Sequence, residues 1–390
     1  MIISGLRISE RLDVAMIALV ISLDYELPHS RRADIRRHMI DPTNALLAVC
    51  HNYGAKLTIM LEIAELWAFE DVKNGHFKHY LGYDPSNEIR QQLVEAICLG
   101  HDVQMHLHPQ WLGGKWSGDG WKLNYDKYRF PLWEYDEMVE VLKRAKKYLE
   151  DLLRPHCAEY SCIGFRAGNW NTQPSVNYLR ALKVAGFKSD TSVFKWGHVD
   201  TPSVYLDYRD AYSNVLPWYA ADDINRTSRA GGIIEFPIYT EAVSLFRMLS
   251  LKRLLLTGKY LIEDRAIAHA VHAANSMGRR RSRGFLSNLN RLLQKRPHKL
   301  DFCKLTKWQM RQMIENIMIQ YGSKEGGYPV PIVMIGHSKE PRPSKGLENF
   351  LEVISKSYSD SIRYATYTEM INDFSRMFPT CHTMPTNLQG

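Results

Sequence analysis

The sequence predicts an α/β barrel of seven or eight βα units, and three observations lead to this fold class. Apolar runs of strand length alternate with segments of helix length along most of the 390 residues. The runs are apolar almost throughout, as in parallel strands that are covered on both faces. Polar residues of catalytic type follow several of the runs, and in such barrels the chemistry collects at the carboxyl ends of the strands.

The individual elements follow from apolar runs and from helix start and stop signals. A proline stands near the start of several expected helices, and Gly54, Gly100 and Gly186 follow the ends of three. The expected strands are 14–23, 56–61, 103–108, 162–166, 187–193, 232–237, 331–336 and 362–366. The expected helices are 41–53, 86–99, 135–153, 174–185, 308–321, 347–358 and a short helix from Thr368.

The whole chain, residues 1–390, is expected to form a single domain, because a hydrophobic content of 45% is ample for one large core. One segment, 244–299, is far longer than a usual connection and is interpreted as a helical basic insertion. It holds much of the +8 net charge, since 279–299 contains eight Lys and Arg residues and no acid. The insertion is either a solvated surface or a contact for an anionic membrane or a lipid-phosphate carrier. Nucleic acid is not expected as a partner, because no binding motif accompanies the charge.

The cysteines and the first apolar run bear on the compartment. The six cysteines show no regular spacing, which favours free thiols in a reducing compartment. The run 14–23 leads into acidic residues without a small-residue cleavage site, so it is interpreted as a strand and not as a signal peptide. No apolar run reaches the ~20 residues of a membrane span. A cytoplasmic protein is therefore expected, with attachment to the inner face of the membrane as an alternative.

Two histidines and two acids form a candidate metal site. His106 and His108 are two residues apart on an expected strand, so both imidazoles point to one face, about 6–7 Å apart. Asp24 and Glu26 share the same spacing after the first strand. Two neighbouring carboxylates ionise together more easily when a cation lies between them. This donor set suits Zn²⁺, with Mn²⁺, Fe²⁺, Co²⁺ or Ni²⁺ as alternatives.

Three ligands suffice for the ion, which leaves one carboxylate for catalysis. We assign Glu26, His106 and His108 as ligands and Asp24 as the general base that takes a proton from an activated water. Arg166 either orients that base or forms an ordinary structural ion pair. His337, flanked by Gly336 and Ser338, is expected in an exposed turn, where it could protonate a leaving amine.

These segments, in this order, resemble the polysaccharide deacetylase family, the NodB-homology group that includes carbohydrate esterase family 4. The resemblance lies in Ser22–Glu26, Gly100–His106, Gly164–Trp170 and Val333–His337, and it covers roughly residues 14–240 and 325–375. It implies a distorted (β/α) barrel and hydrolysis of an N- or O-acyl group, acetyl or formyl, from a sugar or polysaccharide precursor. The roles of the acid pair, the metal histidines, the arginine and the late histidine match those assigned above.

Three positions depart from the family pattern. Tyr25 separates acids that are usually adjacent, Gln110 stands where the second metal histidine is usual, and Arg166 is followed by Ala167 and Gly168 in place of the usual Arg-x-Pro. His108 is interpreted as the substitute for the missing histidine. The departures indicate a divergent branch of the family.

The remaining predictions concern the residues that contact the substrate and two alternative functions. Trp111, Trp170 and Asn169 are assigned as substrate contacts, although tryptophans at such positions are more often core residues. One alternative is an amidohydrolase-type metal-dependent C–N hydrolase, whose HxH would lie on the first strand. The other is a non-catalytic deacetylase-like scaffold at a membrane surface.

Overall fold

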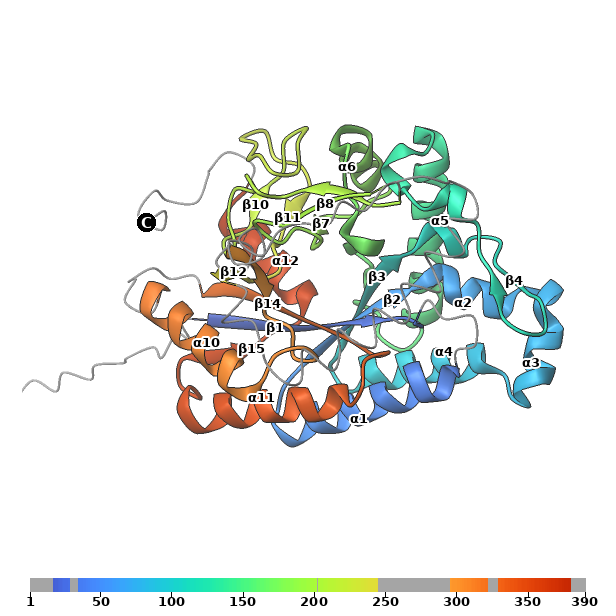
Figure 1. The fold of residues 1–390 in the computed structure, drawn as a ribbon, viewed down its shortest axis with the longest axis horizontal. Coiled ribbons are helices and arrows are strands. Elements are labelled where there is room, and N and C mark those ends of the chain that lie inside the picture. The colour runs from blue at the N-terminus through green and yellow to red at the C-terminus, as the bar shows by residue number, and fades with distance from the viewer. Residues whose placement is uncertain (1–16, 29–33, 202, 245–294, 322–328, 380–390) are drawn as a thin grey trace, which may run out of the picture.

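A computed structural model describes residues 17–28, 34–201, 203–244, 295–321 and 329–379 of the chain. Its centre is a nine-stranded sheet in the order β10-β11-β7-β6-β3-β2-β1-β14, with β15 paired to β1 (Figure 1). The parallel strands are β1 (Ile17–Tyr25), β2 (Leu57–Glu62), β3 (Asp102–Leu107), β6 (Gly164–Ala167), β7 (Ser189–Asp190), β11 (Ile234–Glu235), β14 (Val330–His337) and β15 (Ile362–Tyr364). β10 (Trp218–Tyr219) joins the edge antiparallel to β11.

The sheet curls until its two ends meet, which makes it a distorted barrel. After β11 the chain continues beside the segment that follows β7, where Ile238 N donates to Val193 O at 2.8 Å. The next residue reaches β14, since Tyr239 N donates to Val333 O at 3.0 Å and Ile238 forms a parallel bridge with Val333. Within the described residues, this short contact is the direct join between the two edges. The predicted α/β barrel is confirmed, with this weak closure as its distortion.

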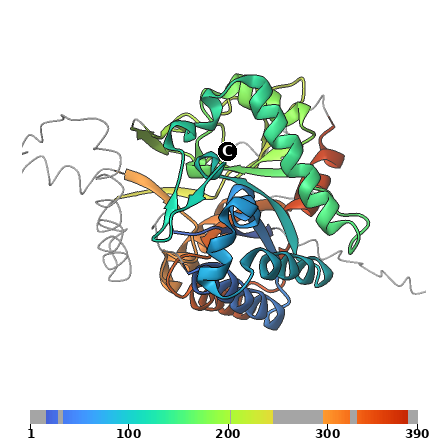
Figure 2. The same cartoon turned by 90° about the vertical axis from the view of Figure 1, so that its right-hand side faces the viewer.

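Helices cover the outside of the sheet (Figure 2). The blue α1 and the orange-red α11 lie side by side on one side, and the green α5 packs with α6 on another. Several begin with a proline or an acidic residue as expected, for instance α4 with Asp84, whose side chain accepts from Ser86 N and Asn87 N. The helices are α1 (Asp41–Asn52), α2 (Ile63–Glu70), α3 (Gly75–Leu81), α4 (Pro85–Cys98), α5 (Tyr135–Leu153), α6 (Ser175–Val184), α10 (Lys307–Tyr321), α11 (Pro343–Ser357) and α12 (Tyr367–Met377).

The last helix, α12, closes the amino end of the barrel. Its N-terminus is fixed by a capping box between Thr366 and Glu369. Tyr367 N donates to Thr58 Oγ1 and Thr368 N donates to Asp102 Oδ2, each at 2.9 Å. Both acceptors lie at the starts of strands, so α12 covers the amino ends and leaves the carboxyl ends for a site.

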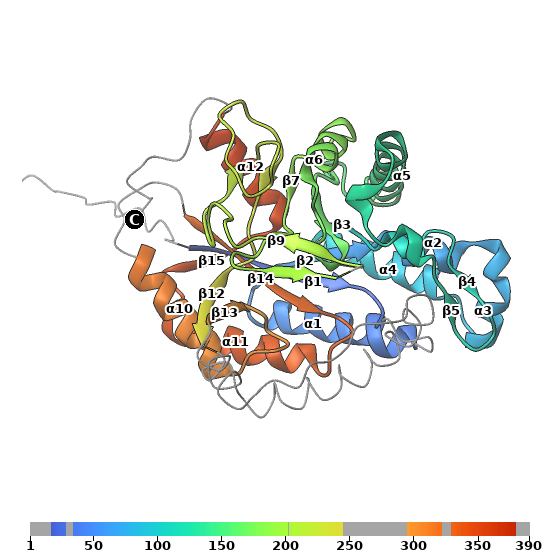
Figure 3. The same cartoon turned by 45° about the horizontal axis from the view of Figure 1, so that its top comes forward.

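The predicted helical insertion 244–299 begins and ends in strands. Thr240–Ser244 forms β12 and Lys295–Lys299 forms β13, and the two pair antiparallel beside α10 (Figure 3). Backbone pairing between the two ends explains why they are strands: the chain leaves and returns at one place. The intervening residues 245–294, which carry most of the predicted basic patch, lie outside the described residues.

Element boundaries differ from the expectations at functionally relevant places. β1 extends through Tyr25 and β14 through His337, because Asp24 and His337 are register partners. His337 is therefore a strand residue and not part of an exposed turn. The loop at 112–133 contains two short paired strands, β4 (Lys115–Trp116) and β5 (Trp121–Lys122), and a second small pair is β8 (His198–Asp200) with β9 (Tyr205–Asp207). Within the described ranges, each helix is too short or too polar to cross a membrane.

Candidate metal and catalytic site

The predicted site residues converge because neighbouring strands end together. Asp24 of β1 is in register with His337 of β14, and His106 of β3 is in register with Arg166 of β6. These positions lie at the carboxyl ends of parallel strands, the end at which barrels hold their functional groups. Segments that lie far apart in the sequence therefore meet at one end of the sheet.

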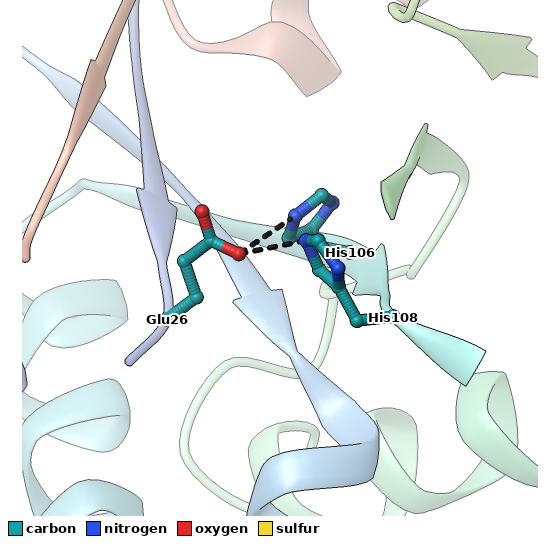
Figure 4. Close-up of side chains that lie close together, drawn as sticks. All are labelled: Glu26, His106 and His108. Carbon is teal, nitrogen blue, oxygen red and sulfur yellow. Dashed lines mark ion pairs between the residues drawn. The ribbon is translucent and has the colours of Figure 1, made fainter. Parts of the chain in front are cut away.

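Glu26 and the two histidines form the first cluster (Figure 4). Glu26 follows β1, and its Oε2 lies 2.7 Å from His108 Nε2 and 3.5 Å from His106 Nε2. Figure 4 shows both imidazoles directed at the same carboxylate oxygen. The alternation of side chains predicted for the strand with His106 and His108 thus places the two imidazole rings together, with ring centroids 4.7 Å apart. All three side chains are buried.

The hydrogen bonds of His106 show that this cluster fits a cation. His106 Nδ1 lies 2.9 Å from the carbonyl oxygen of Arg166. A carbonyl only accepts, so an imidazole proton sits on Nδ1, and the neutral form of the ring presents a lone pair at Nε2. Burial alone would lower the pKa of His106, but Asp24 and Glu26 outweigh it and raise that pKa. His106 Nε2 is buried and makes no hydrogen bond within the described residues, and it and His108 Nε2 both face Glu26 Oε2, at 3.5 and 2.7 Å. Two imidazole nitrogens and one carboxylate oxygen aimed at one point form a donor set that a Zn²⁺-type ion would fit.

Glu26 is also held by a lysine that sequence reasoning missed. Lys339 Nζ lies 2.8 Å from Glu26 Oε1, and the lysine side chain is only 15% exposed. Burial alone would raise the pKa of Glu26, but Lys339 and His108 outweigh it and hold that pKa well below its usual range. Glu26 is therefore ionised, as a metal ligand must be. The position of Lys339, two residues after His337, could have identified it from the sequence as a site residue.

Asp24 and Arg166 form a buried ion pair next to this cluster. Arg166 Nη1 donates to Asp24 Oδ1, Nη2 donates to Ser22 Oγ at 2.9 Å, and Nε donates to Thr191 O at 3.0 Å. The guanidinium contacts Asp24 through one nitrogen, a monodentate contact that fits either the orienting role or a structural ion pair. Burial alone would raise the pKa of Asp24, but Arg166, His106 and His337 keep it below its ordinary value.

His337 completes the second cluster, which it forms with Asp24 and Glu26. Its Nε2 lies 3.4 Å from Asp24 Oδ2 and 4.0 Å from Glu26 Oε1. Burial lowers the pKa of His337 to about 4, although Asp24 opposes this shift. His337 is therefore neutral at pH 7 and would be a strong acid once protonated.

Gln110 contacts His108 directly. It is fully buried, its Nε2 lies 3.1 Å from His108 Nδ1, and its Oε1 has no hydrogen-bond partner. Which end of the amide faces the imidazole follows from the hydrogen-bond network and exchanges by a simple flip. With the oxygen toward the ring, Gln110 would accept a proton from Nδ1 and leave His108 Nε2 for an ion.

The loop after β6 brings two of the predicted substrate contacts to the site. An added Cβ at Gly168 would lie 2.5 Å from Leu107 O and 2.9 Å from His108 Cγ, so glycine permits the close approach of this loop. Asn169 then comes within 3.4 Å of His108 Nδ1. The Trp170 ring lies edge-on to His337 with centroids 6.2 Å apart. Both residues adopt φ of 53°, a left-handed conformation uncommon outside glycine.

Trp111, the third predicted contact, lies in the core. It is 3% exposed, and its ring packs with those of Phe69 and Trp121 at centroid distances of 6.3 and 5.3 Å. The reason is local: residues 109–111 form a short helical turn after β3, which directs the indole toward α2 and β5. Its assignment as a substrate contact stays a prediction.

A further acid that sequence reasoning missed fixes the backbone that follows β3, the strand of His106. Glu62 ends β2, and its Oε1 accepts from His108 N at 2.6 Å. Burial raises the pKa of Glu62 to about 8, although the backbone N–H of His108 opposes the shift. The side chain therefore fixes the backbone of a predicted ligand. Its position at the end of a strand, like that of Asp24, was the signal that could have identified it.

Comparison with known proteins gives matches among solved structures alone. No family model matches the sequence, and no curated protein matches it. A probable polysaccharide deacetylase from Pseudomonas aeruginosa PAO1 is 14% identical, with 94% of this chain and 93% of that chain covered and a TM-score of 0.47. The Puue allantoinase is 11% identical, with 95% and 93% covered and a TM-score of 0.48. A GH57-type branching enzyme from Pyrococcus horikoshii is 13% identical, with 92% and 71% covered and a TM-score of 0.47. These identities and scores support no inference about activity, so function is argued from the site.

Proposed function

We propose that this protein is a metal-dependent hydrolase that removes an N- or O-acyl group, acetyl or formyl, from a sugar or polysaccharide precursor. The observation that carries the proposal is the buried cluster of His106 Nε2, His108 Nε2 and Glu26 Oε2, in which both imidazole nitrogens face one carboxylate oxygen. The order of the motifs, which resembles that of polysaccharide deacetylases, supports the acylated sugar as substrate. A divalent cation, most simply Zn²⁺, is proposed as the cofactor.

The residues divide into those that would hold the ion and those that move protons. Glu26, His106 and His108 would hold the cation. When bound, it supplies polarisation of the acyl carbonyl and a lowered pKa for an attacking water. These effects provide a nucleophile at neutral pH.

Asp24 is the base that takes the proton from the attacking water. It is ionised, because Arg166 offsets the effect of burial on its pKa, and Arg166 holds it by one oxygen. The other oxygen, Oδ2, faces His337 Nε2 at 3.4 Å. His337 Nε2 would take from Asp24 the proton that came from the water and pass it to the departing nitrogen or oxygen, and its low pKa makes the protonated ring a strong donor. Asn169 and Trp170 border the place where the substrate would enter.

The test measures acyl release together with metal content. The protein is stripped with a chelator, reloaded separately with Zn²⁺, Mn²⁺, Co²⁺, Ni²⁺ or Fe²⁺, and assayed for acetate and formate release from N- and O-acylated sugars. We expect release that requires metal and falls at least 100-fold in His106→Ala. The matched control is His156→Ala, which removes an exposed histidine. Absence of bound metal under every loading condition, or equal release by His106→Ala and the control, would overturn the proposal.

A further inference from the structure

Lys299 brings a positive charge to the edge of the proposed site. It is the last residue of β13, and its Nζ lies 3.2 Å from the centroid of the Trp170 ring and 4.2 Å from that of Phe194. Trp170 in turn contacts His337 edge-on. One indole ring therefore separates the ammonium group from the residue proposed to protonate the leaving group.

This ammonium group differs from its neighbours in having no counter-ion within the described parts of the chain. Lys304 lies 3.7 Å from Asp301 and 3.9 Å from Glu340, and Lys339 is paired with Glu26. Lys299 has contacts with aromatic faces alone, which attract a cation but carry no net charge. A partly desolvated charge without a partner is unfavourable.

The pKa of Lys299 is consistent with a missing counter-charge. Burial lowers the pKa of Lys299 well below its ordinary value, and Lys304 lowers it further. Asp301 and Asp24 act in the opposite direction, yet neither forms an ion pair with it. An anion placed against Nζ would supply the missing counter-charge, and a lysine ammonium is a common binder of single carboxylate or phosphate groups.

We propose that Lys299 and Trp170 form a subsite for an acidic group, a carboxylate or a phosphate, on the sugar whose acyl group is removed. This inference rests on the proposed function for the identity of the substrate as a sugar. The acidic group belongs on the same sugar as the acyl group or on the adjoining one, since a single ring separates Lys299 from His337. The subsite makes substrate choice depend on charge as well as on the acyl group.

Equilibrium binding tests the subsite without relying on catalysis. Isothermal titration of the full chain uses glucuronate, glucose 6-phosphate and uncharged glucose as probes. We expect one acidic probe to bind at least tenfold more tightly than glucose, and the better of the two shows whether a carboxylate or a phosphate is preferred. This preference should weaken as ionic strength rises, because added salt screens the ammonium charge.

Variants locate the preference at Lys299. Lys299→Met keeps an apolar stem against the two rings and should reduce the preference at least tenfold, while Lys299→Arg should retain it. The matched control is Lys295→Met, at the exposed start of the same strand. If Lys299→Met fails to fold, Lys299→Gln takes its place. Equal affinities for acidic and neutral probes, or a preference that survives the loss of charge at residue 299, would overturn the subsite. Failure of the proposed function has another sign: acidic probes bind selectively, but no acylated sugar is hydrolysed by the metal-loaded protein.

Discussion

Lys339 and Glu26 form an ion pair that gives the two carboxylate oxygens different partners. Lys339 Nζ lies 2.8 Å from Oε1, whereas Oε2 faces His108 at 2.7 Å and His106 at 3.5 Å. In this arrangement Glu26 would bind a cation through Oε2 alone. The lysine would therefore limit the carboxylate to one ligand atom and places a positive charge close to the proposed ion site.

Replacing this lysine should strengthen metal binding. In Lys339→Met, the repulsion between an ammonium group and a divalent cation disappears and Oε1 becomes available as a second ligand atom. We expect the dissociation constant for Zn²⁺ at pH 7.5 to fall about tenfold, which corresponds to about 1.4 kcal/mol. Competition with a chelating indicator measures it, with Lys345→Met as the control for an exposed, paired lysine. Weaker binding by Lys339→Met would contradict this account.

The contact of Gln110 with His108 should set the metal affinity from outside the ligand set. Gln110→Glu gives His108 Nδ1 a carboxylate acceptor, so Zn²⁺ binding should tighten about tenfold. Gln110→Leu removes the acceptor, and loss of such partners commonly weakens binding about 10- to 100-fold. The same indicator competition measures both variants, and Gln91→Leu on the exposed face of α4 is the control. Unchanged affinity in both variants would show that Gln110 has no such role.

The ion pair between Asp24 and Arg166 should be strongly coupled in stability. Asp24→Asn leaves a fully buried guanidinium without its counter-ion, and loss of one partner of a buried pair typically costs about 3–5 kcal/mol. Arg166→Met should cost a similar amount. The double variant Asp24→Asn/Arg166→Met should be no less stable than either single variant, because it leaves no unpaired charge. Urea unfolding of the metal-free protein measures this cycle, and additive losses would disprove the coupling.

Two buried acids on the paired strands β7 and β11 should make stability depend on pH. Glu235 and Asp190 are register partners, burial raises the pKa of each, and Asp190 raises that of Glu235 further. Above the ordinary glutamate pKa of about 4.3, the unfolded chain releases protons that the folded chain retains. The free energy of unfolding should therefore fall as pH rises, by up to about 1.4 kcal/mol per pH unit for each retained proton.

Glu235→Gln tests this pH dependence, because glutamine keeps the shape of the neutral acid and does not ionise. We expect the variant to lose less stability than the unaltered protein between pH 5 and pH 8 in urea unfolding experiments. Glu159→Gln, at an exposed position, should leave the pH profile unchanged. Parallel profiles for Glu235→Gln and the unaltered protein would show that the pair retains no extra proton on folding.

The carboxyl ends of the strands were the part of the site that the sequence could predict. Period-two alternation placed His106 and His108 on one face, and parallel pairing placed Asp24, Arg166 and His337 at one end of the sheet. Both rules are local or follow from the fold class. They require no knowledge of how loops pack.

Positions that depend on loop packing could not be predicted in this way. The direction of the Trp111 ring is decided by a helical turn and by an aromatic cluster that includes Phe69 and Trp121. Lys299 reaches Trp170 because β13 pairs with β12 across a long stretch of sequence, and no periodicity indicates that register. Such contacts arise from tertiary structure and leave no repeating pattern in the chain.

The pairing of β1 with β14 also has a consequence for the order in which a growing chain can assemble these groups. Glu26, His106 and His108 all belong to the first third of the polypeptide, whereas the register partner of Asp24 is His337. A ribosome must therefore translate more than three hundred residues after Asp24 before that partner exists. Closing so long a loop is slow compared with local pairing. During synthesis the proposed cation ligands precede the proposed proton donor, so on the proposed function a nascent chain would capture metal well before it could turn over substrate.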